Sequence, residues 1–404
     1  MASVPHALLL TTDFRPMRGG IAEYLHRLWD HVAAAVTATV VTTVPPGAVP
    51  WEHAYRLRVL PDPAALAGGQ AVRSGRDVSP AYQVFLMRCY GVEPMLEYVR
   101  ETGAAGAVEA FVGVWNVLSH SWCRALAGAR VPYSLFAHDA ELIDREIYAS
   151  VDSWCDTDVR SARAVYATST DTASRLAARF GPAVDVRVVS PGVAEPPDPA
   201  ACARRAGDLA RELELAGKLV LLTVARLERT KGVDLVLESL AALSRSAPRL
   251  RYVVVGDGAE RGRLQDQARA LGIERLVTFT GPVDETSKLA LYSLCDVFVM
   301  PSRLVPGRPW EGFGIALLEA AMFGKPAVGG RVGGTADAVA DGVTGLLVDT
   351  SDARGTHDAL SRLIADEGLR ARLGAAGRRR VRERSLWPHV ARRFLQEAGL
   401  LVAS

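Results

Sequence analysis

The chain of 404 residues is longer than one hydrophobic core usually supports, so we expect two domains. Its hydrophobic content of 49% and charged content of 23% are ordinary for a globular protein and exclude a disordered or fibrous chain. The sequence contains no run of about 18 apolar residues and no basic segment typical of a signal peptide, so no membrane-spanning helix is expected. Five scattered cysteines without metal-type spacing indicate reduced thiols and a cytoplasmic location.

The formal net charge of +2 is unevenly distributed along the chain. Residues 1–195 carry 17 basic and 20 acidic side chains and no lysine, whereas residues 196–404 carry 30 basic and 25 acidic ones. A basic second half suits a phosphorylated ligand, and an acidic first half does not suggest a nucleic acid. The arginine-rich run GRRRVRERS in residues 377–385 is interpreted as a solvated helix face.

The first half begins as a strand, a glycine-bearing loop and a helix. Val4–Thr12 is predicted as a buried strand, DFRPMRGG as the loop, and IAEYLHRLWDHVAAA as the helix, followed by a second strand at 37–44. In open α/β sheets such loops place ligands at the carboxyl ends of the strands. Gly19 and Gly20 let the backbone approach a ligand, although a tight turn explains them equally well.

Residues 45–80 are rich in Pro, Gly and Arg and are predicted to form a long loop, followed by a helix at Tyr82–Thr102. Further strands are predicted at Ala107–Val112, Tyr133–Ala137 and Ala164–Thr168. His138 and Asp139 follow one of these strand ends, where a structural histidine and a functional one are equally expected.

Asp156 and Asp158 have the spacing of a metal-binding pair, but the surrounding SVDSWCDTDVRSAR has a helical pattern. We therefore expect an acidic helix face there and no metal site. The segment VRVVSPGVAEPPDPAA at 186–201 ends a strand and becomes proline-rich, which makes it the best candidate for an interdomain linker.

Alternating strands and helices then begin again. KLVLLTVARLERTKGVDLVLESLAALSR and RYVVVGDGAERGRLQDQARALG each contain a strand, a loop and a helix. The chain is therefore predicted to be α/β, with two doubly wound parallel-sheet domains at 1–195 and 196–385. A last helix at about 386–402 is expected to cross back onto the first domain.

The stretch from Met300 to Gly334 holds the most informative pattern. Its helix IALLEAAMFG is apolar on all sides except for Glu319, and a lone carboxylate in such a helix is costly unless another group donates a hydrogen bond to it. Gly312 and Gly314 leave backbone N–H groups uncovered at the start of the helix, where anions are stabilised. With Glu311 in the same loop, the pattern suits a ligand that carries both hydroxyls and phosphate.

Two cations lie in the loop after an earlier strand of the same domain. Arg226 and Lys231 in ARLERTKG are plausible as a diphosphate clamp, and Gly256 and Gly258 follow the next strand. Because these strand ends meet at one edge of a parallel sheet, the residues are expected to converge with Glu311. No dinucleotide fingerprint follows Gly258, so an NAD site fits poorly, and no P-loop or zinc spacing appears.

These motifs resemble those of a known family. LTVARLERTKG, VVVGDGAER, FTGPV, CDVFVMPSR and EGFGIALLEAAMFGKPAVGGRVGGTADAV together resemble family 4 of the retaining glycosyltransferases. GGIAEYLHRLW and VVSPGV are similar to that family's acceptor-side glycine loop and interdomain junction, so the resemblance covers essentially residues 1–400. It implies the GT-B fold, in which two Rossmann-like domains face a central cleft and the second holds a nucleotide-sugar donor.

The resemblance also implies roles for single residues. Arg226 and Lys231 would bind the donor diphosphate and stabilise its developing charge. Glu311 would contact sugar hydroxyls, and Glu319 the ribose hydroxyls. Val283 would meet the base through its backbone. The other donor-binding residues implied are Gly256, Gly258, Gly312, Phe313, Gly314 and Ile315.

On the acceptor side, Gly19 and Gly20 would pass close to the leaving phosphate and the acceptor. His138 would face the transferred sugar, whereas the family usually has His-Gly or His-Glu where this chain has His138-Asp139. Tyr24 and Asp139 are expected to contact the acceptor. No metal ion or other cofactor is implied.

The family resemblance leaves the substrates open. UDP-glucose, UDP-N-acetylglucosamine and GDP-mannose all suit the donor site, and the longer loop SRLVPGRPW, with Arg303, Arg308 and Trp310, is a candidate for added contacts. The acidic first half, with a cluster of acidic residues after His138, favours transfer of a hexosyl or N-acetylhexosaminyl group to a soluble natural-product intermediate such as an aminocyclitol, although a solvated acidic helix explains the cluster at least as well. The alternatives are a mannosyl- or glucosyltransferase for a lipid or polysaccharide, with peripheral membrane contact, a GT-B glycoside phosphorylase, and a non-catalytic binder of nucleotide sugars. The oligomeric state is left open.

Overall fold

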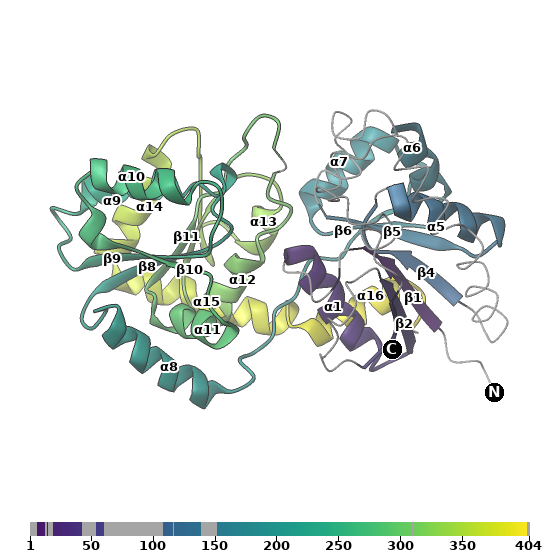
Figure 1. The fold of residues 1–404 in the computed structure, drawn as a ribbon, viewed down its shortest axis with the longest axis horizontal. Helices are drawn as coiled ribbons and strands as arrows, with labels where there is room; N and C mark the ends of the chain where they lie inside the picture. The colour runs from purple at the N-terminus through teal and green to yellow at the C-terminus, as the bar shows by residue number, and fades with distance from the viewer. Residues whose placement is uncertain are drawn as a thin grey trace, which may run out of the picture. The chain divides into compact units, whose positions relative to one another are not determined.

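The structure is a computed structural model that describes residues 6–12, 14, 19–42, 54–59, 108–115, 117–138, 152–308 and 310–401. The chain divides into two compact units, Met1–Pro191 with Trp387–Ser404, and Gly192–Leu386. Each unit is a parallel sheet with helices on both faces, as the sequence predicted (Figure 1). Sequence reasoning placed the junctions at 195 and 385, and the units meet along the chain at Pro191/Gly192 and Leu386/Trp387.

The first unit contains a seven-stranded parallel sheet with the order β3-β2-β1-β4-β5-β6-β7. Buried aliphatic residues in β1, β2, β4 and β5 explain why the sequence predicted them. The strands are β1 (His6–Thr11), β2 (Thr37–Thr42), β3 (Arg56–Val59), β4 (Val108–Val112), β5 (Tyr133–Ala137), β6 (Val165–Ala167) and β7 (Val186–Val188).

Helices cover both faces of this sheet. Side chains of α1 and α16 form one core with the sheet, and those of α5, α6 and α7 form the other. The helices are α1 (Gly20–Val32), α5 (Val117–Gly128), α6 (Asp152–Ser161), α7 (Thr170–Phe180) and α16 (Trp387–Glu397).

Strand β3 corrects the prediction of an uninterrupted loop at 45–80. Arg56–Val59 pairs in parallel with β2 at the edge of the sheet. Arginine and aliphatic residues alternate in it, with Arg56 exposed and Leu57 half-buried, as an edge strand requires. The rest of that stretch, apart from residues 54 and 55, and the helix predicted at Tyr82–Thr102 lie outside the described residues.

The second unit contains a six-stranded parallel sheet with the order β10-β9-β8-β11-β12-β13. Figure 1 shows α9, α10 and α14 on one side of it and α8, α11 and α15 on the other. The strands are β8 (Leu219–Val224), β9 (Leu250–Val255), β10 (Val277–Gly281), β11 (Val297–Met300), β12 (Ala327–Gly330) and β13 (Gly345–Val348). The helices are α8 (Pro199–Glu212), η2 (Arg229–Lys231), α9 (Val233–Leu243), α10 (Arg261–Ala270), η3 (Glu274–Leu276), α11 (Glu285–Leu294), α12 (Ile315–Met322), α13 (Thr335–Ala338), α14 (Arg354–Ala365) and α15 (Glu367–Arg384).

Helix α8 shortens the linker that the sequence predicted at 186–201. The side chain of Asp198 caps the helix by accepting a hydrogen bond from the Ala201 amide at 2.8 Å, and Pro199 occupies its first turn. An N-cap aspartate followed by proline is a helix-start signal that the proline-rich composition concealed.

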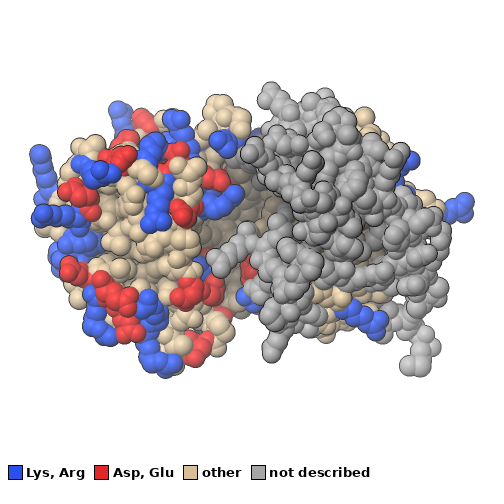
Figure 2. Space-filling model, in the orientation of Figure 1, with Lys and Arg blue, Asp and Glu red and all other residues tan. Residues whose placement is uncertain are grey.

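The surface of the second unit that Figure 2 shows carries interspersed positive and negative side chains, without a large area of one sign. Exposed arginines of this unit include Arg269, which pairs with Asp266, and Arg263, which pairs with Glu260. The uneven charge of the two halves therefore does not produce a single basic surface on this side. Over the described residues, no helix has both the length and the apolar character needed to cross a bilayer.

Helix α16 returns to the first unit and packs beside α1, which confirms the predicted crossing of the last helix. Phe394 is fully buried in it, with its ring centroid 5.1 Å from Phe111 and 5.7 Å from Trp29. These residues come from three distant parts of the chain. The last helix therefore completes the core of the first unit.

We predict that Phe394→Ala lowers the free energy of unfolding by about 3–5 kcal/mol, because the change removes a buried ring and leaves a cavity. Chemical denaturation followed by circular dichroism measures the loss. His389→Ala, on the exposed side of the same helix, serves as the control and is expected to have little effect. Equal stability of Phe394→Ala and the native chain would contradict this packing.

Candidate active site

The predicted site residues of the second unit gather at the carboxyl edge of its sheet. Lys231 lies in the turn that follows β8, and Glu311 lies in the loop that follows β11. These two strands pair directly and in parallel, so both loops leave the same edge of the sheet. The sequence predicted that Lys231 and Glu311 would lie at the same edge of the sheet, and the structure places them there.

Lys231 and Glu311 form an ion pair that is largely shielded from solvent. The Lys231 Nζ atom donates to Glu311 Oε2 at 2.6 Å, and the side chains are only 18% and 12% exposed. The Ser302 hydroxyl donates to the same oxygen at 3.2 Å. Burial by itself raises the pKa of the Glu311 carboxyl, but the Lys231 ammonium, these hydrogen bonds and the charge of Arg226 outweigh it, so the net pKa lies below the ordinary value.

Arg226 lies in the loop between β8 and the Lys231 turn. Its guanidinium is 79% exposed and contacts the carboxylate of Glu228 at 3.0 Å. An exposed guanidinium is free to make bidentate hydrogen bonds with a phosphate group, while the nearby Lys231 supplies a more deeply placed charge. The arrangement therefore provides two cations suited to one diphosphate.

Glycines allow the loops at this edge to approach each other. A Cβ atom on Gly256, whose φ is 120°, would lie 2.0 Å from the Ala225 carbonyl oxygen, and one on Gly258 would lie 2.4 Å from that of Leu227. The sequence assigned both glycines to donor binding. In the structure they pack against the loop that carries Arg226, so they position this loop, and a direct donor contact stays a prediction.

Glu319, the single carboxylate of helix α12, is hydrogen-bonded at both oxygens. Lys288 Nζ donates to Oε1 at 2.8 Å and the Tyr292 hydroxyl donates to Oε2 at 2.7 Å. Both donors lie four residues apart on α11 and therefore on the same face of that helix. This confirms the expectation that a carboxylate in an otherwise apolar helix needs hydrogen-bond donors.

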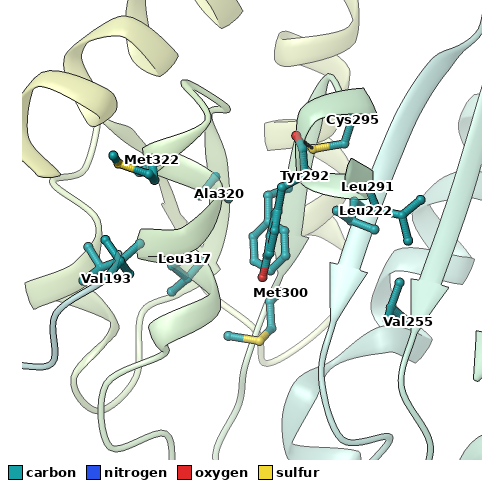
Figure 3. Close-up of a cluster of buried hydrophobic side chains, with 14 of the residues drawn as sticks. Val193, Leu222, Val255, Leu291, Tyr292, Cys295, Met300, Leu317, Ala320 and Met322 are labelled. Atoms are coloured by element: carbon teal, nitrogen blue, oxygen red, sulfur yellow. Dashed lines mark hydrogen bonds between the residues drawn. The ribbon is translucent and has the colours of Figure 1, made fainter. Parts of the chain in front are cut away.

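Tyr292 places its polar hydroxyl at Glu319 from within the hydrophobic core. Figure 3 shows its ring among Leu317 and Ala320 of α12 and Leu222 of β8. Burial raises the pKa of this hydroxyl far above its usual value, and the charge of Glu319 raises it further, so the hydroxyl stays protonated and donates. The core thereby holds Glu319 in one orientation.

Lys288 carries the balancing charge. Burial lowers the pKa of its ammonium, but Glu319 and Glu285 outweigh this effect, so the net pKa is above the ordinary value. Lys288 therefore stays charged beside Glu319. Sequence reasoning missed both Lys288 and Tyr292: their i, i+4 spacing places them on one face of a helix, but the sequence does not show that this face meets Glu319.

The remaining donor-side residues surround the start of helix α12. Gly314 is the N-cap of this helix with φ 91°, Phe313 is buried, and Gly312 and Ile315 are half-buried. Val283 follows β10 and packs against the hydrophobic core of this unit. The roles of these residues at the donor stay predictions.

The predicted site residues of the first unit differ in their exposure to solvent. Gly19 and Gly20 are exposed at the start of α1, and Gly19 has an extended backbone with φ 172°. His138 is buried beside the end of β5, and its Nε2 atom lies 2.7 Å from the Gly113 carbonyl oxygen. Tyr24 is buried and its hydroxyl donates to the Val189 carbonyl at 2.9 Å. Asp139 lies outside the described residues.

These contacts bear on the predicted roles of the first unit. The Tyr24 hydroxyl donates within the core, and the whole residue is only 1% exposed. Its ring packs edge-on against the His138 imidazole, with centroids 5.5 Å apart. Both roles on the acceptor side stay predictions.

The two aspartates with metal-like spacing have different partners. Asp156 accepts from Arg179 at 2.8 Å, whereas Asp158 is buried and accepts from Trp115 and His120, each at 2.8 Å. In the parts of the chain that the structure describes, no group of three or more His, Cys, Asp or Glu residues is arranged to hold a metal ion. Each of the two aspartates therefore has its own structural partners.

We predict that the stabilisation from Glu311 depends on pH. A carboxylate with a lowered pKa stabilises the fold above its unfolded value and loses this effect as the pH falls through the folded value. The difference in unfolding free energy between the native chain and Glu311→Gln should therefore be constant near neutral pH and shrink as the pH falls below 4.5. Urea denaturation from about pH 7 to about pH 3 measures it, and a difference that does not change with pH would contradict the assignment.

Comparison with known proteins places this geometry in a family. The family model described as Glycosyl transferases group 1 matches residues 208–380, which include the Lys231–Glu311 pair. A GDP-mannose-dependent alpha-(1-6)-phosphatidylinositol monomannoside mannosyltransferase from Mycobacterium tuberculosis is 30% identical over 395 residues, which are 95% of each chain. A D-inositol 3-phosphate glycosyltransferase from Stackebrandtia nassauensis is 38% identical over 229 residues, which are 54% of this chain and 47% of that protein.

Solved structures agree at the level of the fold. The crystal structure of Anabaena Alr3699/HepE in complex with UDP matches with a TM-score of 0.77 and 20% identity, over 98% of this chain and 100% of that one. This likeness identifies the two-sheet architecture as the GT-B fold. The full-length relative and the match of the family model together show that the chain belongs to the glycosyl transferases group 1 family, and that it is a retaining hexosyltransferase of glycosyltransferase family 4.

Proposed function

We propose that this enzyme transfers a mannosyl group from GDP-mannose to a hydroxyl of an inositol-containing phospholipid, with retention of the anomeric configuration. The observation that carries the donor class is the Lys231–Glu311 pair beside the exposed Arg226, at the carboxyl edge of the second sheet. The mannosyltransferase relative over 95% of the chain supports the choice of GDP-mannose and of a lipid acceptor.

In this proposal, the donor diphosphate lies against the two cations. Arg226 supplies a planar fork for its oxygens, and Lys231 stabilises the negative charge that develops as the diphosphate departs. Glu311, kept ionised by Lys231, accepts hydrogen bonds from sugar hydroxyls. Glu319, oriented by Lys288 and Tyr292, accepts hydrogen bonds from the ribose hydroxyls.

The chemical step follows from retention. The bond between the anomeric carbon and the diphosphate oxygen breaks, and the acceptor oxygen bonds to that carbon on the same face of the sugar. The acceptor proton passes to the departing phosphate oxygen, so charges and atoms balance without a protein nucleophile. The residues of the second unit therefore act by binding and electrostatic stabilisation.

The comparisons favour the lipid acceptor, which the sequence offered as an alternative, over the soluble aminocyclitol. The aminocyclitol hypothesis rested on acidic residues that follow His138, most of which lie outside the described residues. The relative that spans 95% of the chain acts, by its name, on a phosphatidylinositol monomannoside. A soluble acceptor is accordingly the competing outcome of the acceptor assay.

We predict that GDP-mannose raises the melting temperature of the native chain more than UDP-glucose, UDP-N-acetylglucosamine or an ADP-sugar does, because a ligand that binds the folded state stabilises it by mass action. A thermal-shift screen at equal donor concentrations measures the order. A larger shift with a UDP-sugar would contradict GDP-mannose as the donor but would still support a nucleotide-sugar site. A protein stabilised by none of these donors would contradict the site.

We predict that Lys231→Ala lowers the rate of mannosyl transfer by about 100-fold or more, because it removes the buried cation at the leaving group. Arg226→Ala, whose exposed side chain contributes little to folding, should also reduce transfer strongly. Lys218→Ala is the matched control, because Lys218 immediately precedes β8 at the opposite edge of the sheet. Circular dichroism verifies that each variant is folded, and near-native transfer by folded Lys231→Ala or Arg226→Ala would contradict the clamp.

We predict transfer of radiolabelled mannose to vesicles that contain phosphatidylinositol or its monomannoside. Aminocyclitols in solution are expected to receive none. Transfer only to aminocyclitols would contradict the lipid acceptor, and release of sugar phosphate that requires inorganic phosphate but no nucleotide would identify a phosphorylase instead.

A further inference from the structure

The loop from Pro301 to Trp310 connects β11 with Glu311, and Arg303 near its start does not extend toward solvent. The Arg303 side chain is only 16% exposed, whereas Leu304 and Arg308 of the same loop are exposed. The sequence suggested that Arg303 adds a substrate contact. The structure gives its guanidinium other partners.

Arg303 fastens this loop to the turn that carries Lys231. Its Nη2 atom donates to Asp234 Oδ2 at 2.5 Å, and its Nε atom donates to the Arg229 carbonyl at 3.1 Å. Its backbone amide also donates to the Thr230 carbonyl at 2.8 Å. Arg229 and Thr230 immediately precede Lys231 in the same short helix, so three hydrogen bonds from one residue reach this turn and the helix that follows it.

Asp234 is held as firmly as Arg303. It lies in the first turn of α9, is 13% exposed, and has Arg263 as a second cation at 3.8 Å. Gly232, between Lys231 and this helix, has φ 68°, and a Cβ atom on it would lie 2.1 Å from the Pro301 carbonyl oxygen. The turn and the loop therefore touch through backbone atoms, and Arg303 closes the contact from its outer side.

The same loop ends at Glu311, which belongs to the candidate active site. Ser302, adjacent to Arg303, donates to Glu311, and Glu311 pairs with Lys231. The Lys231 turn and this loop are thus joined by the pair Lys231–Glu311 and by the contacts of Arg303 with Asp234 and with the Arg229 and Thr230 carbonyls. The contacts of Arg303 do not involve Lys231 or Glu311, so they remain in place when these two residues bind a donor.

We propose that Arg303 is a positioning residue for the donor: together with Asp234 it holds the Lys231 turn at the distance from Glu311 that the donor diphosphate and sugar require. This inference rests on the proposed function, in which these two residues bind the nucleotide sugar. Arginine is needed because one planar fork reaches both Asp234 and the Arg229 carbonyl, whereas a lysine ammonium presents a single point charge.

The test compares the full-length native chain with Arg303→Ala, Arg303→Lys, Asp234→Ala and the double variant Arg303→Ala/Asp234→Ala. Titration calorimetry with GDP and with UDP identifies the nucleotide that the native chain binds, and initial rates give KM for donor and acceptor separately. For Arg303→Ala we expect donor KM and the Kd of that nucleotide to rise about tenfold or more, with acceptor KM unchanged, because small displacements of binding groups are costly. Arg303→Lys should lie between Arg303→Ala and the native chain.

Arg179→Lys is the matched control for Arg303→Lys. Arg179 and Asp156 form an arginine–aspartate pair in the first unit, at 2.8 Å, with the arginine 8% and the aspartate 32% exposed, so this variant makes the same change in an ion pair of the other unit. Arg303→Ala and Asp234→Ala should also be coupled, with the double variant binding nucleotide no more weakly than either single variant. Both expectations distinguish a positioning role of Arg303 from a general loss of stability. The melting temperature of each variant measures that loss directly.

Two results would overturn the inference alone: unchanged nucleotide binding by Arg303→Ala, or a rise in donor KM for Arg179→Lys as large as that for Arg303→Lys. A native chain that binds neither GDP nor UDP would overturn the proposed function, and the inference with it. The variants are measured with the nucleotide that the native chain binds. If that nucleotide is UDP, weaker UDP binding by Arg303→Ala still supports the inference.

Discussion

The ion pair between Lys231 and Glu311 is the interaction on which the proposed donor site of this enzyme depends. Two mostly buried charges are stable only while each has its partner and its hydrogen bonds. That requirement holds the loops after β8 and β11 together at one edge of the sheet. It also keeps the Glu311 carboxyl ionised at the place where we propose that a diphosphate and a sugar bind.

The rest of the second unit supports this pair through backbone contact and paired charges. Glycines let the neighbouring loops meet without side chains between them, as at Gly256 and at Gly333, where a Cβ atom would lie 2.1 Å from the Glu311 carbonyl oxygen. Glu319 follows the same rule as Glu311, since a buried carboxylate is matched by a cation and a hydroxyl. The site is therefore built from acids that are each neutralised by a neighbour on a different element.

Much of this arrangement was predictable from sequence, because strand-end loops of a parallel sheet converge whatever their separation in the chain. That rule brought Arg226, Lys231 and Glu311 together, and the apolar helix around Glu319 indicated that hydrogen-bond donors were needed. The identity of those donors was not predictable, since Lys288 and Tyr292 belong to a helix whose rotation only packing determines. The same limit applies to Arg303, which points to Asp234 and away from solvent, and to β3, whose four residues are too few to show a period.

The account is tested most directly by a crystal structure of the full-length protein with GDP-mannose bound. It predicts that the diphosphate oxygens lie within hydrogen-bonding distance of the Lys231 ammonium and the Arg226 guanidinium, with Glu311 at the sugar hydroxyls and Glu319 at the ribose. A donor bound elsewhere, with the Lys231–Glu311 pair unchanged and no phosphate beside either cation, would contradict it.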